Sequence, residues 1–149
     1  MRAREHGFTL IELIAVLLVL AVVAGLASAR MGGGQGKDVL QATAYQIASR
    51  CRAARTAAIR RGSQEVVLID LANRVVRGDG AKTPIGVPAT ISMHAETSLG
   101  EQRSQSVAGI RFLPDGSSSG GTLRLEAGHR AYEVRVNWFT GRVSVERTS

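Results

Sequence analysis

The feature that most constrains this chain is an uninterrupted apolar run over residues 13–29, preceded by Gly7-Phe8-Thr9-Leu10-Ile11-Glu12. As a helix, residues 8–29 would be about 33 Å long, enough to cross a hydrocarbon core of about 30 Å. A secretory signal has a shorter apolar core and is cut after it, whereas the small residue Gly7 lies before this run. We therefore predict a transmembrane helix that stays on the protein, with cleavage at the later Ala27-Ser28-Ala29 as the alternative.

The charged residues near this run predict its orientation in the membrane, and one of them, Glu12, lies within the predicted transmembrane helix itself. Arg2 and Arg4 precede the run, and positive residues keep a flanking segment in the cytoplasm. The domain after residue 30 is then expected in the periplasm or outside the cell. Glu12 lies inside the span, where a carboxylate is costly and usually has a partner or a function. Snorkelling of Glu12 toward the membrane surface is the simpler alternative.

Gly7 is followed by Phe8, and Glu12 is the fifth residue counted from Phe8. This pattern resembles the type IV prepilin signal shared by type IV pilins and type II secretion pseudopilins. The resemblance implies that a membrane-bound prepilin peptidase removes residues 1–7, cutting after Gly7, and methylates the new N-terminus at Phe8. It also implies that Glu12 pairs with the N-terminal amine of a neighbouring subunit during assembly.

The composition allows one small domain behind this anchor. Removal of a leader containing Arg2, Arg4 and Glu5 leaves a formal charge of about +6, which is compatible with a nucleic acid or an acidic partner. The arginines are scattered and aromatic residues are few, so no platform for stacking bases is evident. Cys51 is the only cysteine, and we expect it to be buried and without a function.

A glycine-rich joint is predicted over residues 30–37, because four of the residues from Gly32 to Gly36 are glycines, which disfavour helix. The segment 38–61 then has helical periodicity, with Asp38 as the expected N-cap and Gly62 as the C-terminal stop. One face of this helix should pack on a sheet. That apolar face consists of Leu40, Ala44, Ile47, Cys51, Ala54 and Ala58.

Beyond Gly62, apolar and polar residues alternate, as is typical of antiparallel strands with one face exposed to solvent. We predict strands at residues 65–70, 74–77, 90–94, 109–112, 122–126, 131–138 and 142–146. Residues 78–88 and 95–108 are expected to be loops, and Phe139-Thr140-Gly141 to be a hairpin turn. Trp138 is expected on the same strand face as Val134 and Val136. The predicted fold is therefore α+β: an N-terminal transmembrane helix, then an amphipathic helix on a twisted antiparallel sheet, which could be divided into two sheets.

Residues capable of catalysis are present but do not form a recognisable arrangement. The candidate bases, carboxylates and nucleophiles are His94, His129, Asp70, Asp79, Asp115, Ser117, Ser118 and Ser119. No two histidines or cysteines have the spacing of metal ligands. The sequence therefore predicts no enzyme activity, no metal site and no cofactor, and His129 is expected to lie at an ordinary exposed turn.

The second half resembles the GspH/FimT family through Phe112-Leu113-Pro114-Asp115-Gly116 and Thr140-Gly141-Arg142-Val143, residues that should shape turns. This resemblance implies a pilin-like fold, with residues 38–149 forming a periplasmic head domain. It implies a type II secretion minor pseudopilin in the inner membrane, of single-pass topology, near the tip of a helical filament that drives protein export. The implied partners are other pseudopilins, the prepilin peptidase, the inner-membrane secretion platform and an exported protein.

Two alternatives belong to other classes of protein. A FimT-like minor pilin would bind DNA for uptake, and Arg142 is the candidate contact. In DNA-binding relatives a Gly-Arg-x-Arg motif recurs, but Gly141-Arg142-Val143-Ser144 lacks the second arginine, so nucleic acid is the less favoured partner. The other alternative is an anchored periplasmic protein that never polymerises.

Overall fold

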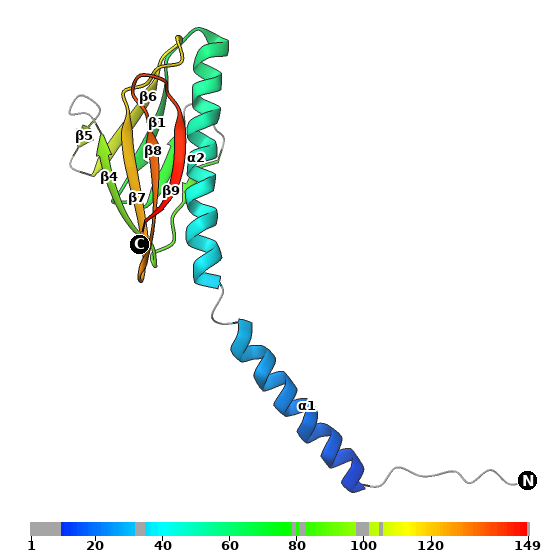
Figure 1. The fold of residues 1–149 in the computed structure, drawn as a ribbon. Coiled ribbons are helices and arrows are strands. Elements are labelled where there is room, and N and C mark those ends of the chain that lie inside the picture. Colours follow the sequence, from blue (N-terminus) through cyan, green and yellow to red (C-terminus); the bar gives the residue numbers. More distant parts are fainter. Residues whose placement is uncertain are drawn as a thin grey trace, which may run out of the picture. The chain divides into compact units, whose positions relative to one another are not determined.

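The computed structural model describes residues 10–31, 35–78, 80, 83–97, 102–104 and 106–148, and within these the side chains of residues 24–38 and 102–104 are not described. Contacts divide the chain into two compact units, Met1–Gly36 and Lys37–Ser149. The helices are α1 (Leu10–Met31) and α2 (Gln35–Arg61), and Figure 1 follows them along the sequence. Gly7 and Phe8 lie outside the described residues.

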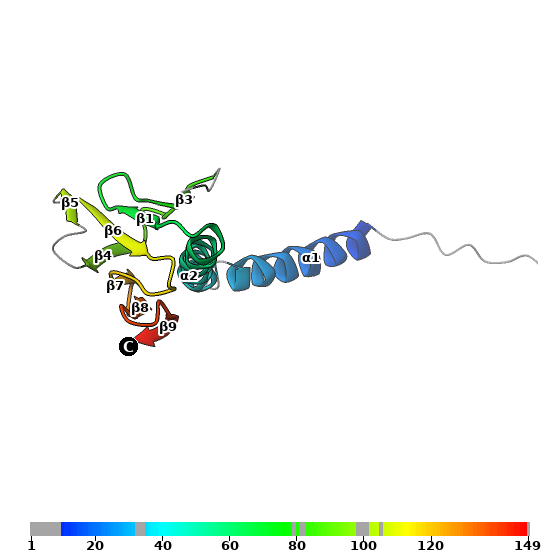
Figure 2. The same ribbon diagram turned by 90° about the horizontal axis from the view of Figure 1, so that it is seen from above.

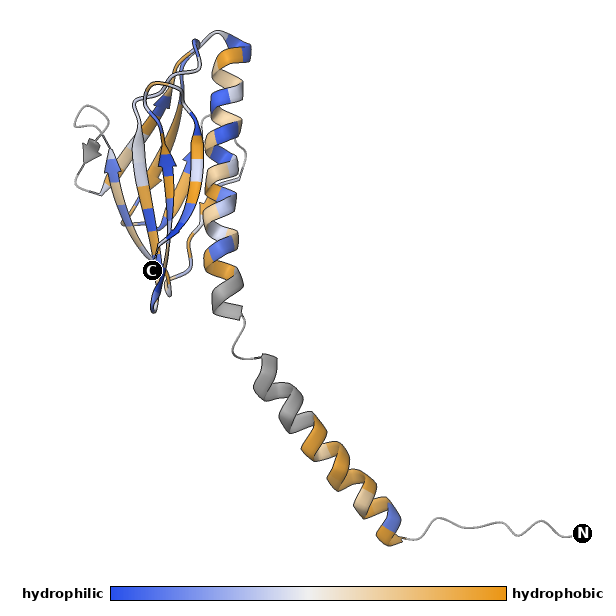
Figure 3. Ribbon diagram, in the orientation of Figure 1, coloured by the Kyte–Doolittle hydropathy of each residue, from blue (hydrophilic) through white to orange (hydrophobic). Residues whose placement is uncertain are grey.

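The first unit contributes α1, which is coloured almost wholly hydrophobic where its residues are described (Figure 3). Leucine and isoleucine are good or adequate helix formers, and α1 contains no proline, so a continuous helix is expected. Its large apolar side chains from Leu10 to Val23 are all exposed, with Leu10 at 77%. Among the described residues, no helix combines the length and the apolar character needed to cross a membrane.

The two helices are separated at residues 32–34, inside the predicted joint at residues 30–37, and these three residues lie outside the described part. Within that joint, α1 extends to Met31 and α2 begins at Gln35. The prediction that Asp38 caps α2 is therefore wrong, because Asp38 lies inside the helix. A helix of 27 residues can accommodate the cost of one glycine, about 1 kcal/mol, at Gly36.

The apolar face predicted for α2 is confirmed. Leu40, Ala44, Ile47, Cys51, Ala54 and Ala58 are all buried. Ala48 and Thr43 are buried as well, and the Thr43 hydroxyl donates to the Val39 carbonyl oxygen at 2.7 Å. The small alanine side chains allow the helix to approach the strands closely. Gly62 ends α2 with a φ of 65°, as predicted, and Arg61 pairs across this turn with Glu65 at 2.6 Å.

Two antiparallel sheets pack with α2 (Figures 1 and 2). One has the order β3-β2-β1-β6-β5 and the other the order β4-β7-β8-β9. The strands are β1 (Glu65–Asp70), β2 (Val75–Gly78), β3 (Ile85–Gly86), β4 (Ser92–Thr97), β5 (Gln102–Ser104), β6 (Val107–Phe112), β7 (Gly121–Ala127), β8 (Arg130–Val136) and β9 (Val143–Thr148). The prediction of an antiparallel sheet, here divided into two, is confirmed.

A single apolar core joins α2 to both sheets. Phe112 and Ile110 come from the first sheet and Leu123 and Val134 from the second, each 1% exposed or less. Pairing of β1 with both β2 and β6 places Val67 and Ile69 at the centre of the first sheet. The core thus lies entirely within the second unit.

Two predicted loops contain strand residues. The first, residues 78–88, includes β3, and the second, residues 95–108, includes the end of β4, all of β5 and the start of β6. These loop predictions are wrong at those positions. The strands are short, and β5 pairs with β6 through an irregular register, so no clear alternation is available in the sequence.

The turn between β1 and β2 is also shifted. Arg74 was expected to begin a strand but lies in the turn with a φ of 56°. Its guanidinium donates to the carbonyl oxygens of Val87, Pro88 and Ile91, and so ties down the segment before β4. The strand that was expected to begin at residue 90 begins at Ser92.

Candidate functional site

The first candidate site is the start of α1. Glu12 lies in the first turn of this helix, where a negative side chain interacts favourably with the helix dipole. Apolar side chains surround it along the chain, since Leu10, Ile11 and Leu13 are 77%, 76% and 56% exposed. The two other residues predicted for processing and assembly, Gly7 and Phe8, lie outside the described residues. The structure therefore places only Glu12 of this set.

The second candidate site is formed where two turns of the head meet α2. One is the Pro114-Asp115-Gly116 turn after β6, and the other is the turn between β8 and β9 that contains Gly141. Both glycines have positive φ, 87° and 61°, as expected of these turn motifs. The Arg55 side chain of α2 joins them by donating from Nε to the Gly116 carbonyl oxygen at 2.9 Å.

Gly141 has a second reason to be glycine. A Cβ at this position would lie 2.2 Å from the Gly116 carbonyl oxygen and 2.7 Å from Arg55 Nε. No side chain fits between these groups, so the close approach of the two turns requires glycine. The turn that contains Gly141 was expected to shape the sheet, and it also lies against the Arg55 side chain.

Asn137 fixes the conformation of the same turn. Its Oδ1 accepts hydrogen bonds from the amides of Phe139 and Thr140 and from the Thr140 hydroxyl, at 2.9–3.0 Å. The Asn137 amide donates to the Arg142 carbonyl oxygen at 2.9 Å, and the Gly141 amide donates to the Asn137 carbonyl oxygen at 2.8 Å. The turn is therefore a rigid platform rather than a loosely held loop.

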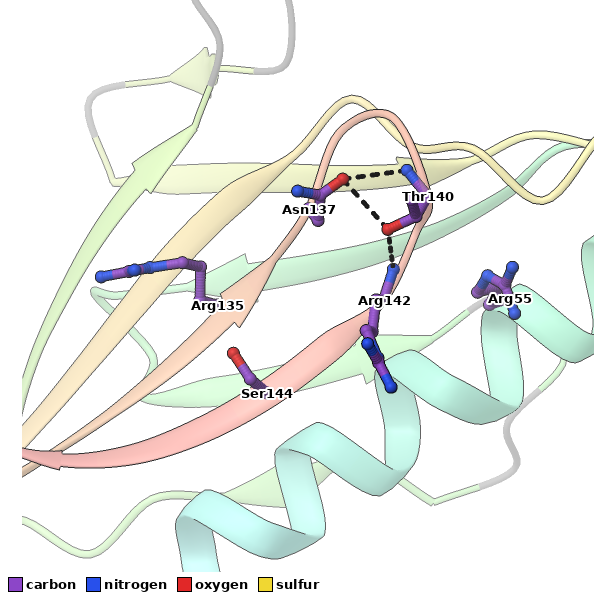
Figure 4. Close-up of a pocket in the computed structure, with 6 residues that line it drawn as sticks. All are labelled: Arg55, Arg135, Asn137, Thr140, Arg142 and Ser144. Carbon is purple, nitrogen blue, oxygen red and sulfur yellow. Dashed lines mark hydrogen bonds between the residues drawn. The ribbon is translucent and has the colours of Figure 1, made fainter.

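A hollow of about 630 Å³ opens beside this turn, and Figure 4 shows the side chains around it. Arg142 extends toward α2, the helix that carries Arg55, whereas Arg135 extends away from both (Figure 4). Arg135 is already paired with Glu133 at 2.8 Å. The residues lining the hollow are Arg55, Arg135, Asn137, Thr140, Arg142 and Ser144, three cations with no carboxylate.

The candidates considered for catalysis do not come together in the described structure. Asp70 accepts hydrogen bonds from the side chain and the amide of Asn73, and these lower the pKa of its carboxyl. Asp115 accepts from the hydroxyl and the amide of Ser117, which lower its pKa likewise. Both carboxylates stabilise their own turns. Asp79 lies outside the described residues.

The other candidates have local roles or belong to different strands. The Ser118 hydroxyl donates to the Asn137 carbonyl oxygen at 3.1 Å and so ties the β6–β7 connection to the β8–β9 turn. His94 lies on β4, and His129 lies in the turn between β7 and β8, as predicted. No group of three or more possible metal ligands occurs in the part of the chain that the structure describes.

Sequence reasoning missed two features of the second site. Arg55 is not part of the apolar face predicted for α2, yet it is half-buried against the Gly116 turn. Trp138 was expected on the buried face of its strand, which is wrong: β8 ends at Val136, and Trp138 is 67% exposed in the turn. The sequence does indicate that the strand ends before Trp138, because the preceding residue, Asn137, is of a type that commonly begins turns.

Comparison with known proteins identifies two family patterns in the chain. Residues 43–141 match the model of the type II transport protein GspH, and residues 2–28 match the prokaryotic N-terminal methylation motif. The type II secretion system protein H of Xanthomonas campestris pv. campestris is 30% identical over 142 residues, which cover 95% of this chain and 83% of that protein.

Solved structures share the fold at lower identity. The minor pseudopilin EpsH from the type 2 secretion system of Vibrio cholerae superposes with a TM-score of 0.59 at 17% identity, over 73% of this chain and 97% of that one. The type IV minor pilin FimU of Pseudomonas aeruginosa gives a TM-score of 0.53 at 14% identity, over 74% and 90%. The fold is thus common to pseudopilins and pilins, whereas the sequence match covers nearly the full chain. This chain belongs to the GspH family of type II transport proteins, the minor pseudopilins of type II secretion.

Proposed function

We propose that this chain is a minor pseudopilin anchored in the inner membrane by residues 8–29, with its head in the periplasm. In this proposal a prepilin peptidase cleaves after Gly7 and methylates Phe8, and the product enters a short helical fibre near its tip. The fibre is assembled with other pseudopilins on the inner-membrane secretion platform and helps to export folded proteins.

The observation that supports this most strongly is the surface of α1. Its described large apolar side chains are exposed on every face, whereas the head has a buried apolar core. Exposed apolar surface of this extent is not stable in water and needs lipid or neighbouring helices. A pseudopilin encounters both, first in the membrane and then in the filament.

Glu12 is the proposed assembly residue. An N-methylated amine at Phe8 would remain cationic, and the Glu12 carboxylate would pair with the amine of the adjacent subunit. In an apolar filament core such a pair is costly to break, because removing one partner leaves a buried charge uncompensated. Pairing would therefore fix the axial register of stacked helices.

Processing is tested by mass spectrometry of the chain purified from cells that contain the secretion machinery. We expect an N-terminus at a methylated Phe8, and loss of this product in a Gly7→Asp variant. As a matched control, Gly36→Ala should be processed normally, since it lies beyond the apolar run. An N-terminus at any residue other than Phe8 would contradict the proposal.

A second candidate function is a FimT-like minor pilin that binds DNA. Two observations favour it: the fold is shared with the minor pilin FimU, and Arg142 lies in a hollow lined by three arginines. Binding of duplex DNA that falls steeply with salt would support this function. The absence of DNA binding at low salt would exclude it.

A further inference from the structure

The end of the head where the two turns meet carries an unusual exposed surface. Trp138 and Phe139 are 67% and 71% exposed, and their rings are in edge-to-face contact with centroids 5.5 Å apart. Beside the neighbouring Gly116 turn, Ile59 and Leu113 are also exposed. We call these four residues, together with Arg55 and Arg142, the turn patch.

The backbone that carries the aromatic pair is fixed by hydrogen bonds. Asn137 fixes the backbone of Phe139 and Thr140 through its Oδ1, and the Ser118 amide donates to the Trp138 carbonyl oxygen at 2.8 Å. A Cβ at Gly120 would lie only 2.9 Å from the Trp138 Cβ, so the turn also rests directly on the β6–β7 connection. A turn whose backbone is already fixed loses less conformational entropy on binding, and tryptophan is enriched at the energetic centres of protein interfaces.

The three arginines that line the hollow at this turn differ in whether their charge already has a partner. The Arg135 charge is met by Glu133. Arg55 donates from Nε to the Gly116 carbonyl oxygen, which orients its guanidinium, and it has no carboxylate partner among the residues that the structure describes. The Arg142 side chain is exposed and has no hydrogen-bond or ion-pair partner among the described residues. The hollow therefore offers two arginines for an anion, and their planar forks match a carboxylate.

An acidic protein segment fits this surface better than a nucleic acid does. Duplex DNA is bound by a row of cations that neutralise successive phosphates, whereas one of the three arginines that line the hollow, Arg135, is already paired with Glu133. A turn that carries both exposed aromatic residues and an exposed arginine has the composition of a protein interface.

We propose that the turn patch docks an acidic segment of a partner protein, with an Asp or Glu carboxylate on Arg142 and Arg55 and a neighbouring apolar side chain against Trp138 and Phe139. The proposed function supplies only the nature of the partner, another protein of the secretion fibre. The site itself is independent of α1 and Glu12.

Trp138 is the only tryptophan of the chain, so its fluorescence reports directly on this surface. The full chain in nonionic detergent is titrated with the capped peptide Glu-Glu-Leu-Glu-Glu, with its Lys-Lys-Leu-Lys-Lys counterpart, and with a short DNA duplex. We expect a saturable change in Trp138 emission with the acidic peptide alone. Arg142→Gln should weaken the apparent affinity by about tenfold, as expected for the loss of a charge-assisted hydrogen bond.

The matched control is Arg77→Gln, which removes the same charge from an exposed position on β2 of the other sheet and should bind as the parent does. Phe139→Ser keeps every charge and should also weaken binding. Equal binding by Arg142→Gln and Arg77→Gln, equal binding of the two peptides, or Arg142-dependent binding of DNA alone would overturn the proposal. Failure of the proposed function would instead show in fibre incorporation of Glu12 variants, which this titration does not measure.

Discussion

The two helices use apolar residues in opposite ways. In α1 the described leucines, isoleucines and valines are exposed all round, whereas in α2 the buried residues form one stripe and the arginines lie largely outside it. The contrast is visible in the colouring of Figure 3. A helix whose apolar surface is uniform does not choose one side of a protein, so it suits lipid or a bundle of like helices. An amphipathic helix has one apolar face, and that of α2 packs against the sheets of the head.

The largest expected effect comes from placing one charge on each helix. Leu40 is 1% exposed, so Leu40→Asp buries an unpaired carboxylate in the core and should unfold the head, at a cost of about 4 kcal/mol or more. Leu17 is 57% exposed, and Leu17→Asp should leave thermal unfolding of the head unchanged. Circular dichroism of both variants in detergent tests this. If both variants destabilised the head equally, the two helices would not differ in the way described.

Gly141→Ala should have the next largest effect. The added Cβ meets the Gly116 carbonyl oxygen and Arg55, and the positive φ is unfavourable for alanine. Together these should lower the free energy of unfolding by about 2–4 kcal/mol. Gly128→Ala is the matched control, because Gly128 also has positive φ, 60°, but a Cβ there meets nothing within 4 Å. If urea denaturation gave both variants the same loss, close approach would not be the reason for Gly141.

A smaller effect is expected at Cys51, on the buried face of α2. Burial raises the pKa of its thiol to about 12, although the nearby Arg52 charge acts in the opposite direction. The thiol stays neutral in the folded chain while the unfolded thiol ionises near pH 9. Stability should therefore be unaffected below pH 9 and fall as the pH rises from 9 toward 12, with a slope of up to about 1.4 kcal/mol per pH unit from this group.

Denaturation curves of the parent and of Cys51→Ala between pH 8 and 11 measure this contribution. The parent should lose stability faster than the variant above pH 9, and the native thiol should resist iodoacetamide until the head unfolds. Parallel pH profiles, or rapid labelling of the native chain, would show that this face of α2 is more open than the structure indicates.

The smallest effect concerns Asp115 beside the turn patch. The Ser117 hydroxyl and amide hold the pKa of this carboxyl below its ordinary value, so its contribution to stability is present above that value and is lost as the pH falls through the lowered pKa. Ser117→Ala should raise the Asp115 pKa toward 3.8, measured by NMR titration. An unchanged pKa would mean that the hydroxyl is not the main cause.

Local sequence patterns predicted the elements whose burial repeats regularly. The α2 stripe, the paired strands β7 to β9 and the glycine turns at Gly62 and Gly116 all follow from spacing and from residues with special backbone freedom. The helix was predicted over residues 8–29, and α1 does contain Glu12, in its first turn.

Features that depend on contacts distant in the sequence were not predictable. Gly141 and Gly116 belong to different turns, which approach each other only in the folded head. Arg55 of α2, which bonds to the Gly116 turn, lies 61 residues earlier in the sequence. Strand β5 depends on its pairing with β6 and has no strong alternation of its own. Trp138 was misplaced because a continuous alternation conceals where pairing stops and the turn begins.

The Glu12→Ala variant tests directly whether α1 acts in assembly as well as in anchoring, as we propose. The variant and the parent are expressed with the other pseudopilins, fibres are isolated from the cell envelope, and both the N-terminus and the amount in the fibres are measured. We predict that Glu12→Ala is cleaved before Phe8 and methylated like the parent, but is depleted from the fibres at least tenfold. Incorporation of Glu12→Ala at the level of the parent would contradict the account.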